Sequence, residues 1–139
     1  MRENRSMPRC TVIPELPYSD VESAVEWLCN AYGFTPRIRV GTHRAQLNVG
    51  DGAVIVMERG EDDASCAVMV RVEDIDRHHA AAARAGAVIE TPPKDYPYGE
   101  RQYTASDPGG HTWTFSESIA DAAPEDWGGI AVVLEAQAP

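Results

Sequence analysis

The side chains that could carry chemistry in this sequence are its histidines, cysteines and carboxylates, and their spacing is the first evidence of function. The histidines are His43, His78, His79 and His111, and none forms the His-x-x-x-His pair of a zinc protease. The three cysteines have no close pair, which fits neither a zinc knuckle nor a redox pair. No glycine-rich phosphate loop and no Gly-x-Ser-x-Gly elbow is present. We therefore interpret the histidines as structural or solvated, and expect His111, after a turn, to hydrogen-bond locally.

One arginine and one glutamate stand out by their place in predicted strands. Residues 66–72 alternate, with three valines on one face, so Met69 and Arg71 must lie on the other face. Arg71 there either binds an anionic ligand group in bidentate fashion or forms an exposed ion pair worth under about 1 kcal/mol. Glu58 ends another predicted strand and is either a general base or polar anchor, or a carboxylate paired with a neighbouring arginine.

Composition excludes several classes of protein. The net charge of −10 and the pI of about 4.7 leave no basic surface for nucleic acid. No apolar run approaches the length of a membrane span, and the first ten residues lack the apolar region of a secretory signal. Unpaired cysteines suit a reducing compartment. We expect a cytoplasmic protein with neither a nucleic-acid partner nor a membrane partner.

The first half of the chain is predicted to contain one helix and four strands. A Ser-x-x-Glu capping box at Ser19 opens the helix, apolar residues at helical spacing continue it, and Gly33 ends it. The strands are predicted from alternation and from the glycine turns between them, at residues 11–18, 35–40, 44–49 and 53–58.

The second half repeats this order. Asp74 is a good N-cap for a helix at 75–85, which Gly86 ends. Strands are predicted at residues 66–72, 87–91, 101–106 and 112–116, the last two joined by an Asp-Pro-Gly-Gly turn. Residues 92–99 read as a loop rich in proline and tyrosine, whose Tyr96 and Tyr98 either form a mobile lid or pack against the next strand.

The repeat defines the domain organisation. The helix starts Asp20 and Asp74 lie 54 residues apart and the terminating glycines lie 53 apart, a shared period that indicates a duplicated unit. We predict one domain at 10–119, made of modules at about 10–60 and 66–119, after a flexible N-terminus at 1–9. The tail at 120–139 contains Trp127 and the apolar run 130–134, so we expect it to pack on the domain or on a homodimer partner.

The doubled strand–helix–strand–strand–strand unit resembles the vicinal-oxygen-chelate superfamily, which includes glyoxalase, bleomycin-resistance and dioxygenase proteins. The motifs that carry the resemblance are residues 20–34, Tyr98-Gly99-Glu100-Arg101, and the stretch 107–115 with its Asp-Pro-x-Gly-x-x-Trp pattern. The resemblance implies an α+β fold in which two tandem βαβββ modules form a curled-sheet cup with the helices on the outer face.

The resemblance also implies where a metal would be bound. Metal-dependent members hold the ion with side chains of the first and last strands of each module, and here those positions are Ile13, Ala67, Thr114 and, within one residue, Glu58. A divalent ion needs three or four converging His or carboxylate ligands, and only Glu58 is of that type. We therefore expect no metal and no cofactor.

Strand alternation, counted from these family positions, predicts which residues line the cup. If Ile13 faces inward, so does Glu15, which becomes the nearest acidic counterpart of Arg71, while Thr114 faces inward from the last strand. The candidate ligand-binding residues are Glu15, Glu58, Met69, Arg71 and Thr114.

Two functions follow from these residues. The first is a metal-independent protein that binds a small organic molecule in a cup-shaped pocket. The alternative is an enzyme of the same superfamily, either a metal-dependent lyase, isomerase or dioxygenase, or a metal-free enzyme with an acid/base residue. Fold alone does not decide between them.

Overall fold

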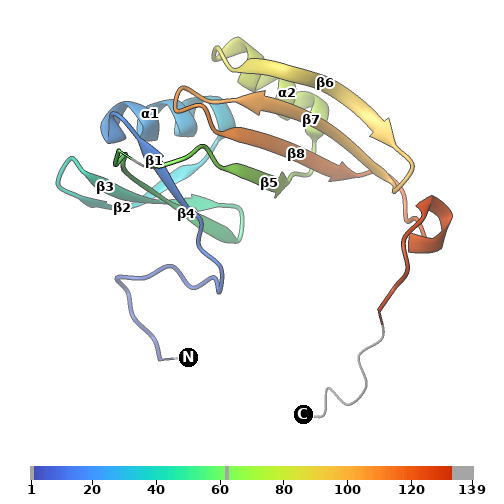
Figure 1. Cartoon of the computed structure of the whole chain (residues 1–139), viewed down its shortest axis with the longest axis horizontal. Coiled ribbons are helices and arrows are strands. Elements are labelled where there is room, and N and C mark those ends of the chain that lie inside the picture. Colours follow the sequence, from blue (N-terminus) through green and yellow to red (C-terminus); the bar gives the residue numbers. More distant parts are fainter. Residues whose placement is uncertain (1, 62, 133–139) are drawn as a thin grey trace.

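Each half of the chain folds into a four-stranded sheet with one helix against it (Figure 1). The computed structural model describes residues 2–61 and 63–132. The first module contains β1 (Glu15–Tyr18), α1 (Val21–Tyr32), β2 (Thr35–Val40), β3 (Arg44–Val49) and β4 (Gly52–Glu58). The second contains β5 (Ala67–Arg71), α2 (Ile75–Arg84), β6 (Val88–Tyr96), β7 (Glu100–Ser106) and β8 (Thr112–Ser118), followed by the short 3-10 helix η1 (Pro124–Trp127).

The two sheets have the same strand order, which confirms the predicted duplication. The first sheet has the order β1-β4-β3-β2 and the second β5-β8-β7-β6. Strand β1 runs parallel to β4, and β5 runs parallel to β8. The other neighbouring strands are antiparallel. The fold is therefore the expected α+β arrangement of two tandem modules. None of its helices, in the part of the chain described, is long and apolar enough to cross a membrane.

Both helices start where the sequence places an acidic cap. The Asp74 carboxylate accepts a hydrogen bond from the backbone N–H of Arg77, as expected. In α1 the N-cap is Asp20, which accepts from the N–H of Ser23, and not the predicted Ser19. Gly33 follows α1 with a φ of 78°, a left-handed conformation that favours glycine and ends the helix.

The core lies between the helices and the sheet faces that carry the bulky alternating residues. Trp113 and Phe115 of β8 are fully buried, as is Val56 of β4. The opposite face of each sheet is concave and carries the alternate residues, which include Gln46 and Ile55 on the first sheet and Gln102 and Thr114 on the second. Val68 and Val70 pack against the core, so β5 has the predicted orientation.

Three strand predictions were wrong, and proline or edge position explains two of them. Strand β1 begins at Glu15 and not at Thr11, since Pro14 has no N–H for the ladder and contributes only its carbonyl, which accepts from Ile55. Strand β6 continues to Tyr96 through the region predicted as a loop. It is an edge strand, and the register shift between Thr91 and Lys94 accommodates its two prolines. Strand β8 extends to Ser118.

A buried carboxylate joins the two modules. Asp107 is 6% exposed, and its Oδ2 accepts from the Tyr18 hydroxyl at 2.5 Å and from Trp113 Nε1 at 2.9 Å. Its Oδ1 accepts from the backbone N–H groups of Gly109 and His111. Burial, and then the bond to Asp107, raises the pKa of Tyr18 far above its usual range, so this phenol remains a donor.

A histidine and an arginine reinforce this junction. The fully buried ring of His111 contacts the Pro17 carbonyl through Nε2 at 2.6 Å and accepts from the N–H of Cys66 through Nδ1 at 2.9 Å. Its partners lie 94 and 45 residues away in sequence, so the expectation of a local hydrogen bond was wrong. The Arg59 guanidinium donates to the carbonyls of Pro17 and Gly109.

The junction predicts a large effect of one substitution. Asp107→Ala leaves the Tyr18 hydroxyl and the Trp113 indole N–H buried without an acceptor, so we expect the free energy of unfolding to fall by about 2–4 kcal/mol. Urea denaturation measures this loss. The matched control is Asp51→Ala in the exposed β3–β4 turn, which should stay within about 0.5 kcal/mol of the parent. Equal stability of the two variants would contradict the role given to Asp107.

Candidate functional site

The concave face of the second sheet carries a cavity of about 520 Å³. Strand β5 contributes Met69 and Arg71, because its valines occupy the helix side. Met69 is 60% exposed, which is unusual for a large apolar side chain and makes it available to a ligand. The remaining lining residues come from β7, β8, the turn before β7 and η1: Tyr98, Glu100, Gln102, Ser116, Ser118 and Trp127.

A row of hydrogen-bonded polar groups forms the floor of this cavity. Arg71 Nη2 donates to Ser118 Oγ at 3.0 Å, and Ser116 Oγ donates to Glu100 Oε1 at 2.7 Å. Gln102 Nε2 donates to Ser116 Oγ at 3.0 Å. The strand register explains the row, because Arg71 and Gln102 both lie opposite Ser116 on its two neighbouring strands.

Glu100 is the anionic group of this row. Hydrogen bonds from the hydroxyls of Ser118 and then Ser116 lower the pKa of its carboxyl, and the positive charge of Arg71 acts in the same direction. The site therefore presents a guanidinium and a carboxylate, each held in place by hydroxyl groups of β8.

The rings of Tyr98 and Trp127 form one wall of the cavity, and Tyr96 supports Tyr98 from outside the lining. Tyr96 and Tyr98 stack with ring centroids 5.4 Å apart, and Trp127 meets Tyr98 edge-on at 5.5 Å. The Tyr98 hydroxyl donates to Gln102 Oε1 at 3.1 Å, which ties the wall to the polar floor. Trp127 remains 46% exposed, so part of its indole is open to a ligand. The tail therefore contacts the domain through Trp127. Of the apolar run 130–134, which we expected to pack, Val133 and Leu134 lie outside the described residues.

The structure separates the two charges that the sequence placed together. Glu15 lies on the first sheet, where its carboxylate accepts from Arg44 Nη2 at 3.0 Å. Arg71 lies on the second sheet and bonds Ser118 instead. The carboxylate that acts on Arg71 is thus Glu100, and Glu15 is not its nearest counterpart.

Thr114 and Glu58 occupy different faces. Thr114 is on the concave face, in register with Met69, and its hydroxyl shares a hydrogen bond with Thr104 at 3.0 Å. Glu58 is exposed and follows Val56 by two residues, so alternation turns it to the helix side of β4. The concave position there is held by Met57.

The positions at which a metal would be expected do not suit one. They hold Ile13, Ala67 and Thr114, and the single carboxylate, Glu58, lies on the other face of its sheet. Within residues 2–61 and 63–132 there is no group of three or more His, Cys, Asp or Glu side chains placed to hold an ion. This donor set does not fit a divalent cation.

Sequence reasoning missed most of the lining of the cavity. The sequence identified Met69 and Arg71, and placed Tyr98 only in a predicted loop. Glu100 and Gln102 could have been found from the alternation of β7, since they are out of phase with the buried Tyr103. The sequence predicted that the tail with Trp127 packs on the domain or on a partner, but its position beside Tyr98 depends on the folded tail.

Comparison with known proteins gives a consistent result. The model of the Glyoxalase/Bleomycin resistance protein/Dioxygenase superfamily matches residues 9–115. TioX from Micromonospora sp. ML1 is similar at 35% identity, with 79% of this chain and 99% of that chain covered and a TM-score of 0.72. The comparison with curated proteins gives no match.

Two more distant structures are similar in fold alone. A glyoxalase/bleomycin resistance protein/dioxygenase from Nocardioides is 18% identical, with 85% of this chain and 89% of that chain covered and a TM-score of 0.65. Lactoylglutathione lyase from Agrobacterium tumefaciens is 12% identical, with 81% and 96% covered and a TM-score of 0.66.

The polar floor predicts a pH-dependent change. Ser118→Ala removes the largest cause of the lowered pKa of Glu100, so we expect that pKa to rise toward the usual glutamate range. Because the pKa in the folded protein is depressed, the stabilisation from ionised Glu100 is present above the unfolded value and lost as the pH falls. Carboxyl ¹³C NMR titration measures the shift. Ser106→Ala, which removes a hydroxyl bonded to the exposed Glu90, should leave Glu100 unchanged.

Proposed function

Because this chain belongs to the glyoxalase/bleomycin resistance protein/dioxygenase superfamily, we propose that it binds a small organic molecule on the concave face of its second sheet, without a metal ion. One observation carries the proposal: a charged pair, Arg71 and Glu100, sits in a cavity whose wall is aromatic. Ligand pockets typically combine an apolar lining with a few polar groups that fix orientation.

The lining also favours a class of ligand. Tyr98, Trp127 and Met69 offer flat or flexible apolar contacts that suit an aromatic ring. Arg71 suits a carboxylate or another oxygen acceptor, and Glu100 suits an N–H or ammonium group. We therefore favour an aromatic molecule that carries both an acidic and a basic group.

Binding is a better account of Glu100 than acid/base catalysis. A general base works best when its pKa lies near the operating pH, and the hydroxyls of Ser118 and Ser116 lower the pKa of Glu100 from its ordinary value, away from neutral pH. Its hydroxyl partners hold it as an anion, which suits an anchor. The enzymatic alternative would be supported if a molecule found by binding were converted to product.

Assembly and location are part of the proposal. Ile130 and Val132 remain 85% and 81% exposed in the single chain. Burial of such side chains stabilises an interface, so we expect a homodimer in which the tail is covered. Light scattering after gel filtration measures the mass, and a monomer at micromolar concentration would contradict this. Three free cysteines suit the cytoplasm, where we place the protein.

The binding proposal is tested by a thermal-shift screen of amphoteric aromatic compounds, followed by titration of each hit. A ligand at 100 times its Kd should add about 2.7 kcal/mol of stability. Arg71→Met should weaken binding about tenfold or more, because a hydrogen bond to a charged group is lost, with little change in Tm. Arg44→Met, which removes the arginine of the first sheet, is the matched control.

Two results would count against the proposal. One is a hit that binds Arg71→Met as tightly as the parent. The other is a hit whose binding disappears after dialysis against a chelator, because the site proposed here contains no metal.

A further inference from the structure

The concave face of the first sheet is covered by the chain's own N-terminal segment. Residues 2–9, which sequence predicted to be flexible, belong to no strand of the described structure and pass beneath the first sheet (Figure 1). Three successive carbonyls of this segment accept hydrogen bonds from side chains of the sheet. Arg37 Nη2 donates to Arg5 O and Met7 O, both at 3.0 Å, and Gln46 Nε2 donates to Ser6 O at 2.9 Å.

The two donors are built into the sheet. Pro36 pairs with Leu47 and Ile38 with Gln46, so Arg37 is the extra residue of a β-bulge. Such bulges re-aim a side chain, and here Arg37 also donates to Gln46 Oε1, which orients both groups. Gln46 is 8% exposed and would be costly to bury without partners. The face therefore presents a preset pair of donors for carbonyl oxygens.

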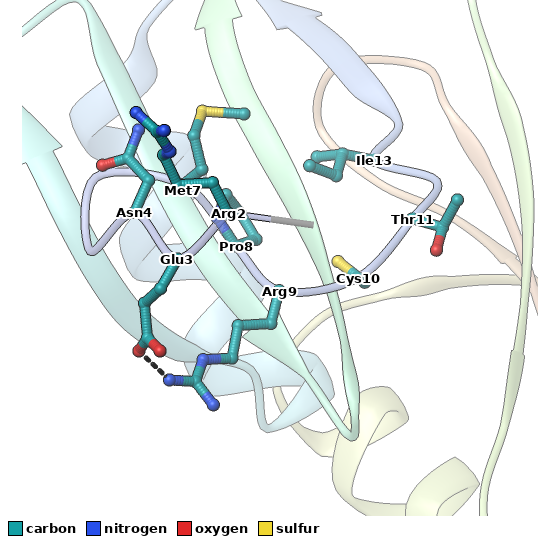
Figure 2. A pocket seen from close by; sticks show the side chains of 9 residues that line it. All are labelled: Arg2, Glu3, Asn4, Met7, Pro8, Arg9, Cys10, Thr11 and Ile13. Carbon is teal, nitrogen blue, oxygen red and sulfur yellow. Dashed lines mark hydrogen bonds and ion pairs between the residues drawn. The ribbon is translucent and has the colours of Figure 1, made fainter.

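The bound segment is recognised through its main chain. Of the described residues 2–9, only Pro8 is buried, and the hydrogen bonds to the sheet are made by main-chain carbonyls. Figure 2 shows the segment turning back on itself, with Arg9 paired to Glu3. The Asn4 carboxamide oxygen and carbonyl accept from the N–H groups of Ser6 and Met7, so a local turn sets the shape of the segment.

The N-terminal segment leaves unfilled space between itself and the first sheet. A hollow of about 340 Å³ lies between Pro8, Arg9, Arg37 and the β3–β4 turn, and a second of about 500 Å³ lies inside the loop of residues 2–13. Recognition by a few main-chain hydrogen bonds, with space on both sides, leaves the segment easy to exchange.

We propose that the concave face of the first sheet is a binding site for peptide-type ligands with successive amide carbonyls, occupied here by residues 5–7 as a removable strap. Arg37 and Gln46 are its donors. A peptide in trans competes with the strap for the same atoms. This site is on the other sheet from the cavity of Arg71, so the inference does not rest on the function proposed above.

Trypsin cleavage of the full chain after Arg5 tests the proposal. Because the sheet holds the carbonyls of Arg5, Ser6 and Met7, we expect this bond to be cleaved mainly in the released form, so the cleavage rate follows the population of that form. Arg37→Met removes the two hydrogen bonds that this charged donor makes to the strap, so cleavage should speed up about tenfold or more. Arg39→Met is the matched control, since Arg39 lies two residues along β2 on the helix side, beside Glu26 and Cys29.

The second arm of the test uses a peptide and the unaltered chain, so it does not depend on how well a variant folds. The probe is acetyl-Asn-Gln-Ser-Met-Pro-amide, which follows residues 4–8 with glutamine in place of Arg5, so that it has no trypsin site. The strap has an effective concentration on the order of millimolar, so the peptide is added at about 10 mM. It should speed cleavage after Arg5 severalfold in the parent and leave the already fast rate of Arg37→Met unchanged.

Two outcomes overturn the proposal. Equal cleavage rates in the parent, Arg37→Met and Arg39→Met would mean that Arg37 does not hold the strap. A parent rate that the peptide leaves unchanged would mean that the face does not accept a peptide in exchange.

Discussion

The buried carboxylate of Asp107 is the interaction on which the arrangement of the two modules depends. It accepts from a phenol of β1, an indole of β8 and two N–H groups of its own turn. A buried carboxylate without partners would be strongly destabilising, so these groups must come together. The turn also sits close to β1, because a Cβ at Gly109 would lie 2.6 Å from a ring carbon of Tyr18. Only glycine permits this approach.

Two sheets joined in this way present two concave faces with different chemistry. The second face is open and carries charges of both signs beside aromatic rings. The first face carries Arg37 and Gln46 as donors, and the chain's own carbonyls satisfy them. A duplicated fold can thus support two distinct binding surfaces, because only the helix-facing residues must stay apolar to build the core.

Much of the fold could be predicted from periodicity. The valines of β5 fixed which face Arg71 occupies, and Asp74 marked the start of α2. The errors lie where proline weakens the strand signal. Strand β6 runs through Pro92 and Pro93 as an edge strand with register shifts, which a local rule reads as a loop.

The sequence by itself determined the duplicated α+β architecture, the capped helices and the exposure of Met69 and Arg71, because alternation and capping act over a few residues. Only the tertiary structure decided which side chains pair with one another. Glu15 bonds Arg44 while Arg71 lies beside Glu100, and His111 reaches a carbonyl 94 residues away. Such pairings depend on how strands align across sheets and modules, which local periodicity does not encode.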